Sequence, residues 1–187
     1  MENTMVIKDL MIPLKEYATV DEDATLYEAY VALEDAQEAL DMEKYEYKHR
    51  AILVYDKNKK IVGKVGQVDA LMALEPKYAG LGDVKAMSLA GFSPAFLKNM
   101  IETNALWNET AEVICKNAMN RKVKAYMHTP TKGEFIREEA SMREAVHLLV
   151  MGQHHSLLVT RDEEIVGILR LTDVFTTIYK LMKSLKQ

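Results

Sequence analysis

Two stretches of the chain carry nearly the same pattern of hydrophobic and polar positions. Residues 51–63 read AILVYDKNKKIVG, and residues 156–167 read SLLVTRDEEIVG. In each stretch an apolar run, a polar turn and a second apolar run follow one another, which predicts two strands joined by a turn. Asp69 and Asp173 then stand where apolar residues begin to recur at helical spacing. Each stretch therefore predicts a strand–turn–strand–helix unit.

The repetition also extends upstream of these strands. After a shift of 116 residues, LMIPLKEYATVDEDATLYEA aligns without a gap with YMHTPTKGEFIREEASMREA. Thr25-x-x-Glu28 and Ser141-x-x-Glu144 have the form of capping boxes, in which a hydroxyl and a carboxylate bond amide groups at a helix start. Each half therefore predicts the order β-α-β-β-α, and the chain belongs to the α/β (α+β) class.

This order of elements, with these residues, resembles the CBS (cystathionine-β-synthase) domain over about residues 5–75 and 120–183. Two such domains in tandem resemble a Bateman module, in which two three-stranded sheets pack face to face with helices outside. The resemblance implies a first CBS domain at residues 1–75 and a second at residues 123–187. Residues 76–122 would form an all-helical insertion between them.

The first half departs from the repeat in two places. It carries extra residues, mostly within EDAQEALDMEKYEYKHR, where Ala36 and Leu40 predict a first helix lengthened over about residues 34–48. In the insertion, Ser93-Pro94 and Asn108 predict the starts of two helices, with Trp107 at the corner of a helical hairpin or small bundle. The apolar faces of these helices either fill a core or form a dimerisation or docking surface.

Asp69 and Asp173 are the first candidates for ligand binding. An Asp at a helix start can cap the helix, or it can accept a sugar hydroxyl where free amide groups converge. In CBS domains that this chain resembles, the Asp of a Gly-x-x-(Ser/Thr)-x-x-Asp phrase accepts hydrogen bonds from ribose. Gly66 and Arg170 replace the hydroxyl residue of that phrase. Gly66 lacks a polar side chain, whereas the guanidinium of Arg170 suits a phosphate.

Arg50, His155 and Thr129 are candidates for contact with the phosphate end of the ligand. Arg50 and His155 each precede a strand, at positions that often carry phosphate-binding basic residues in similar CBS domains. Thr129 matches a position that brings a hydroxyl or backbone group to the nucleotide. Together with Arg170, these residues favour the site around Asp173 as the better of the two. The alternative for each is an exposed polar side chain that binds nothing.

Composition excludes several other functions. The net charge of -4 leaves no basic face for nucleic acid, and no apolar run is long enough to span a membrane. The N-terminus, MENTMVIKDL, lacks the pattern of a signal peptide, so we expect a soluble, cytoplasmic protein. His147, His154 and His155 lack metal-ligand spacing, and no nucleophile motif is present. We therefore expect no metal, no cofactor, no catalytic residue and no enzymatic activity.

The sequence thus leads to two hypotheses about function. In the first, the chain senses AMP, ADP, ATP, S-adenosylmethionine or a related adenosine ligand between its repeats. Binding would then change the state of a separate effector protein, or act through a homodimer. In the second, the chain is a scaffold or dimerisation module that uses the CBS fold without a ligand.

Overall fold

Two β-sheets form the centre of the molecule. The computed structural model describes residues 5–82 and 91–186. The first sheet has the order β2-β3-β4, formed by β2 (Thr19–Asp21), β3 (Ala51–Tyr55) and β4 (Ile61–Gly66). The second has the order β1-β7-β6-β5, formed by β1 (Ile12–Pro13), β5 (Phe135–Arg137), β6 (Ser156–Arg161) and β7 (Glu164–Arg170). In both sheets the first strand of the repeat runs parallel to the second, and the third is antiparallel to the second.

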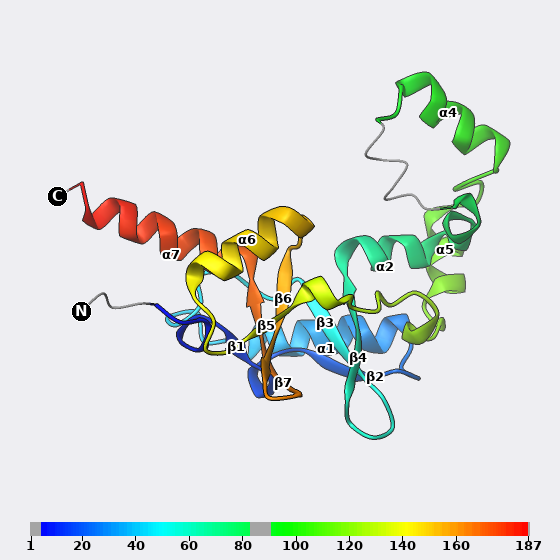
Figure 1. Ribbon diagram of the computed structural model, residues 1–187. Coiled ribbons are helices and arrows are strands. Elements are labelled where there is room, and N and C mark those ends of the chain that lie inside the picture. Colours follow the sequence, from blue (N-terminus) through cyan, green and yellow to red (C-terminus); the bar gives the residue numbers. More distant parts are fainter. Residues whose placement is uncertain (1–4, 83–90, 187) are drawn as a thin grey trace.

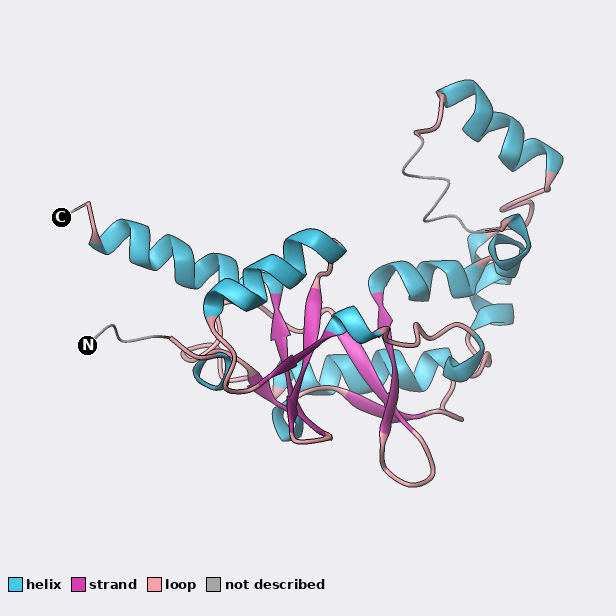
Figure 2. Cartoon of the chain, in the orientation of Figure 1, coloured by secondary structure: helices cyan, strands magenta, loops and turns pink. Residues whose placement is uncertain are grey.

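The helices surround the two sheets (Figure 2). In the first repeat α1 (Leu26–Glu38) follows β2 and α2 (Gln67–Leu74) follows β4, while in the second α6 (Met142–Gly152) follows β5 and α7 (Leu171–Ser184) follows β7. The insertion contributes α4 (Pro94–Thr103) and α5 (Ala111–Ala118). Short 3₁₀ turns span Ile7–Asp9, Leu14–Glu16, Pro76–Leu81, Val123–Ala125 and Lys132–Glu134. The β-α-β-β-α repeat predicted from the sequence is confirmed in both halves.

Alternation along the strands divides the core into layers. Successive side chains of a strand point to opposite faces of the sheet. Leu53 of β3 and Leu158 of β6 therefore meet in a cluster between the two sheets. Their neighbours Ile52 and Leu157 join separate clusters that pack against the helices of their own repeats. The sheets thus pack face to face with helices outside, as the resemblance implied.

Each repeat sends its leading segment to the sheet of the other repeat. Ile12 of β1 pairs with Ile168 of β7, so β1 adds a fourth strand to the second sheet. At the equivalent place in the first sheet, Lys64 of β4 pairs with His128. This exchange joins the two halves through the backbone, in addition to the apolar layer between them.

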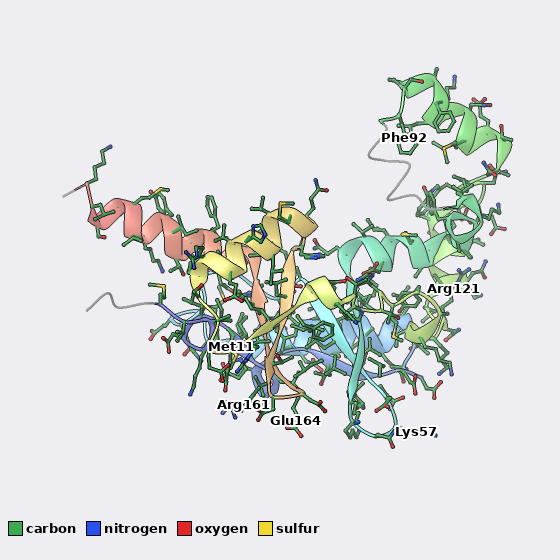
Figure 3. The ribbon with its side chains drawn as sticks, viewed as in Figure 1. Met11, Lys57, Phe92, Arg121, Arg161 and Glu164 are labelled. Atoms are coloured by element: carbon green, nitrogen blue, oxygen red, sulfur yellow. The ribbon has the colours of Figure 1, made fainter. Side chains whose placement is uncertain are left out.

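The polar turns of the two hairpins lie on the same side of the molecule. Lys57 marks the turn between β3 and β4, and Arg161 and Glu164 mark the turn between β6 and β7 (Figure 3). The helices α2 and α7 begin at the opposite ends of the same hairpins (Figure 1). Asp69 and Asp173 therefore lie in equivalent positions, each in the first turn of its helix.

The prediction of a lengthened first helix is wrong. Helix α1 ends at Glu38, and residues 39–50 form turns and irregular backbone. The carboxylate of Asp41 accepts hydrogen bonds from the amides of Glu43 and Lys44, at 2.9 and 3.3 Å, a turn that competes with the helix. Leu40 is buried in the cluster between the sheets, so the segment folds back onto the molecule.

The insertion contains the two predicted helices, but they do not form a packed hairpin. Ser93 caps α4, as predicted, by accepting a hydrogen bond from the amide of Phe96. The cap residue of α5 is Thr110 and not Asn108, so that prediction is wrong. Helix α5 contacts α2, whereas α4 buries none of its side chains and stands away from both sheets (Figure 1). Phe92 stacks on Phe96 at the far end of the insertion (Figure 3).

Trp107 lies at the corner between α4 and α5, as predicted. Its backbone amide donates a hydrogen bond of 2.9 Å to the buried carboxylate of Glu75. Its indole Nε1 donates one of 3.0 Å to the hydroxyl of Tyr78. These bonds attach the corner of the insertion to the segment that follows α2.

Candidate ligand site

A cavity of about 410 Å³ lies in the first repeat, between α1, α2 and the strands β3 and β4. Its walls are mostly apolar and include Leu33 of α1 and Ile52 of β3. Arg50 and Gln67 bring polar groups to it. A concave, largely apolar volume with a few polar groups is typical of small-molecule sites, which range from roughly 300 to 1,000 Å³.

Small residues keep this cavity open. Gly66 ends β4 and Ala70 lies in the first turns of α2, and both line the cavity. The repeat places Arg170 and Val174 at the equivalent positions of the second half. The first site therefore has space where the second has side chains.

Asp69 does not line the cavity itself, but it lies between Gly66 and Ala70 in the sequence, and both of these residues do. Its Oδ2 accepts a hydrogen bond of 2.7 Å from the amide of Gly66, so Asp69 does cap the start of α2. Among residues 5–82 and 91–186, no group donates a hydrogen bond to its Oδ1. This second oxygen is available to a ligand hydroxyl.

Arg50 lies next to the same end of the strand. Ala51 and Gly66 are register partners in the first sheet, which places Arg50 beside the cavity that it lines. Its side chain is exposed. A guanidinium in this position can bond a phosphate with two parallel hydrogen bonds.

In the second repeat, Arg170 and Asp173 bond each other. The Nε and Nη2 atoms of Arg170 donate hydrogen bonds to the two carboxylate oxygens of Asp173, each at 2.6 Å. Nη1 donates a third bond, of 2.7 Å, to the carbonyl oxygen of Tyr47. Arg170 is only 5% exposed, and its guanidinium bonds groups of the protein itself.

The group of candidates that the sequence assigned to the second site is divided by the fold. Arg50 borders the cavity of the first repeat. Thr129 is exposed and follows His128, which pairs with β4 of the first repeat. His155 is also exposed, and its carbonyl accepts a hydrogen bond from the amide of Leu171, so it stays with the second repeat beside Arg170 and Asp173.

A buried charge cluster joins the repeats and was not predicted. The carboxylate of Glu134 accepts bonds of 2.6 Å from Lys64 Nζ and from His128 Nε2, and one of 3.0 Å from the amide of Thr131. Burial would raise the pKa of Glu134, but these donors, with Lys64 first among them, lower it to about 2. Thr131-x-x-Glu134 has the form of a capping box, which is the signal in the sequence that could have indicated this carboxylate.

Neither a metal site nor a membrane span is found in the described part of the chain. Within residues 5–82 and 91–186, no three His, Cys, Asp or Glu side chains gather closely enough to hold a metal ion. No helix in these ranges combines the length and the apolar character that crossing a membrane requires.

The sequence matches the family model of the CBS domain twice, over residues 7–76 and 116–180. These two regions make up most of the chain, which therefore belongs to the CBS domain family as a tandem pair. Among curated proteins, none matches this sequence.

Solved structures of CBS-pair proteins share the fold of the whole chain. A CBS domain-containing protein of unknown function from Bacillus anthracis is 18% identical with a TM-score of 0.59, and the alignment covers 94% of each chain. The CBS-pair protein CBSX2 from Arabidopsis thaliana is 18% identical with a TM-score of 0.55, covering 97% of this chain and 99% of that one. A second structure of CBSX2, in complex with AMP, has a TM-score of 0.52 at 18% identity and covers 95% and 98% of the two chains.

Proposed function

We propose that this chain is a regulatory module that binds an adenine nucleotide, or a related adenosine ligand, in the cavity of its first repeat. The observation that carries the proposal is the open volume of about 410 Å³ where Gly66 and Ala70 leave room, with Gly66 bonded through its amide to Asp69. The complex of CBSX2 with AMP supports the choice of ligand class. AMP, ADP, ATP and S-adenosylmethionine are the candidates.

Each part of such a ligand has a suitable group at this site. The apolar walls formed by Leu33 and Ile52 suit a purine ring. The Oδ1 atom of Asp69, whose Oδ2 is bonded to the amide of the cavity residue Gly66, can accept a hydrogen bond from a ribose hydroxyl. The exposed guanidinium of Arg50 can bind phosphate. The chain would then bind a ligand and respond to it by a change in conformation, which requires no catalytic residue.

Ligand binding would act on the insertion through α2. Gln67 and Leu71 of α2 line the cavity, and α2 also contacts α5. A ligand that binds one position of α2 more tightly than another shifts the equilibrium between the two positions. Movement of α2 would be transmitted to α5 and α4, which makes the insertion a suitable contact for a separate effector protein.

The homodimer expected from the sequence has a suitable surface on α7. Phe175, Tyr179 and Met182 lie on one side of this helix and are 65%, 58% and 63% exposed. Large apolar side chains that remain exposed together are typical of protein interaction surfaces. Sedimentation of Phe175→Glu should show a monomer, and an unchanged sedimentation coefficient would place the dimer contact elsewhere.

A second candidate function is that of a scaffold without a ligand. The exposure of α4 supports this function. Phe96, Leu97 and Ile101 are 43–48% exposed, and no residue of α4 is buried. Such a helix suits contact with another protein even if the cavity binds nothing. Deletion of residues 91–104 should then abolish partner binding and leave the melting temperature unchanged.

A thermal-shift panel distinguishes the two functions. A ligand at a hundred times its dissociation constant stabilises the folded state by about 2.7 kcal/mol, a shift of several degrees in Tm. One of the four adenosine ligands should raise the Tm of the native chain, and less so that of Arg50→Ala. Lys48→Ala, which removes an exposed cation two residues away, is the matched control. If no ligand changes the Tm, the scaffold function is the better account.

A further inference from the structure

The two repeats differ most in the connection between their first helix and their second strand. In the second repeat, residues 153–155 join α6 to β6. In the first repeat, residues 39–50 join α1 to β3. The additional residues run along the surface of the molecule and are anchored to it, because Leu40, Tyr45 and His49 are buried.

The middle of this connection reaches the second repeat and contacts Arg170 there. The carbonyl oxygen of Tyr47 accepts the hydrogen bond from Nη1 of Arg170. The guanidinium carbon of Arg170 lies 5.8 Å from the centre of the Tyr45 ring, within the range of a cation–π contact. Further along α7, Lys180 pairs with Glu46 at 3.6 Å.

Other contacts hold the connection in place from the first repeat. The hydroxyl of Tyr45 donates a hydrogen bond of 2.7 Å to the carboxylate of Glu16. Nε2 of His49 lies 2.9 Å from the carbonyl oxygen of Glu16, and the imidazole packs on Tyr17 with ring centres 4.3 Å apart. The side-chain amide of Gln37 donates to the carbonyl of His49 at 2.6 Å. Contacts from both repeats therefore fix residues 45–49 of the connection.

The consequence is that Arg170 and Asp173, the two groups at the start of α7 that suit a phosphate or a ribose, are both engaged. Both oxygens of Asp173 accept hydrogen bonds from Arg170, and the remaining guanidinium edge bonds the connection. We infer that residues 45–47 are a built-in occupant of the second ligand position, so that one chain binds one nucleotide, in the first repeat. The count of one nucleotide per chain rests on the proposed function. The occupation of the second position by the connection, which we call its closure, does not.

Closure can be tested without any nucleotide. Hydrogen exchange measured by mass spectrometry would compare the native chain with Arg170→Met, which keeps the length of the side chain but removes its donors. Arg161→Met is the matched control, because Arg161 also bonds a carboxylate through two nitrogens, on Glu138, away from the connection. Peptides covering residues 40–50 should exchange at least about tenfold faster in Arg170→Met only. Equal exchange in both variants would overturn the inference.

Calorimetry with AMP then counts the sites. The native chain should bind one AMP, Asp69→Asn should bind none, and Asp173→Asn should still bind one. Two AMP molecules per native chain would overturn the inference and leave the proposed function in place. Loss of binding in Asp173→Asn, with binding kept in Asp69→Asn, would place the ligand in the second repeat and overturn both. Absence of binding by all four adenosine ligands would overturn the proposed function instead, and hydrogen exchange would still decide whether the second position is closed.

Discussion

A Cβ atom at Gly167 would lie 2.5 Å from the carbonyl oxygen of Ile12, where β1 crosses onto the second sheet. Only glycine lets the two backbones approach this closely. Gly63 has the same role in the first sheet, but there the nearest obstacle is the flexible side chain of Met127, and the nearest backbone atom, the carbonyl oxygen of His128, is 3.3 Å away. The glycine that both halves repeat is therefore a consequence of the exchanged segments.

This difference predicts unequal effects of alanine at the two glycines. Gly167→Ala should destabilise the fold by about 2–3 kcal/mol, because a backbone must move, and Gly63→Ala by about 1 kcal/mol, because Met127 can turn aside. Urea unfolding measures both. Gly80→Ala is the control, since a Cβ atom there meets nothing within 4 Å. Equal losses at Gly63 and Gly167 would contradict the backbone argument.

The buried charge cluster predicts a dependence of stability on pH. Because the pKa of Glu134 is lowered to about 2 in the folded chain, its contribution is complete above the unfolded value near 4.5 and is lost as pH falls toward 2. Glu134→Gln should lower the free energy of unfolding by about 2–3 kcal/mol at pH 7 and by much less at pH 3.

Denaturant unfolding of Glu134→Gln at pH 3, 5 and 7 checks this expectation. The control is Glu139→Gln, because Glu139 pairs with Arg137 only at 3.5 Å on the surface, where ion pairs contribute little. A loss that is the same at all three pH values would mean that Glu134 acts through packing rather than charge.

The two helix caps predict a third difference between the repeats. Thr25 and Glu28 form a complete capping box: the amide of Glu28 donates a hydrogen bond of 3.2 Å to Oγ1 of Thr25, and the amide of Thr25 donates one of 2.7 Å to the carboxylate of Glu28. Ser141 accepts from the amide of Glu144 at 3.3 Å, but the reciprocal bond predicted from the sequence is not formed among the described residues. Thr25→Ala should cost about 1–2 kcal/mol and Ser141→Ala about 0.5–1 kcal/mol, measured by thermal unfolding. A larger loss at Ser141 would contradict this order.

The fold could be predicted from the sequence because its signals are local and occur twice. Strand alternation around Leu53 and Leu158 and the helix starts at Thr25 and Ser141 each depend on a few adjacent residues. The path of residues 39–50 could not be predicted in this way. Leu40 continues the helical spacing, and only contacts with the distant sheets make burial of that side chain more favourable than another helical turn.

The sequence indicated several polar residues near the ends of the strands, but not their hydrogen-bond partners or the position of the cavity. The repeated phrase indicated Asp69 and Asp173 equally, and a free Arg170 favoured the second. The bond from Arg170 to the carbonyl of Tyr47 joins residues far apart in the sequence, so no local pattern indicates it. Gly66 and Ala70 leave room for a cavity because they are small, and this is recognisable only once α1 and α2 are placed around them.

The most direct test of the account makes the first repeat resemble the second. Gly66→Arg introduces the residue that stands at this position in the second repeat, where it can bond Asp69 and fill the cavity. Gly80→Arg adds the same side chain at an exposed glycine and is the control. Calorimetry should show that the native chain and Gly80→Arg bind an adenosine ligand with equal affinity and that Gly66→Arg binds none. Undiminished binding by Gly66→Arg would contradict the assignment of the ligand to the first repeat.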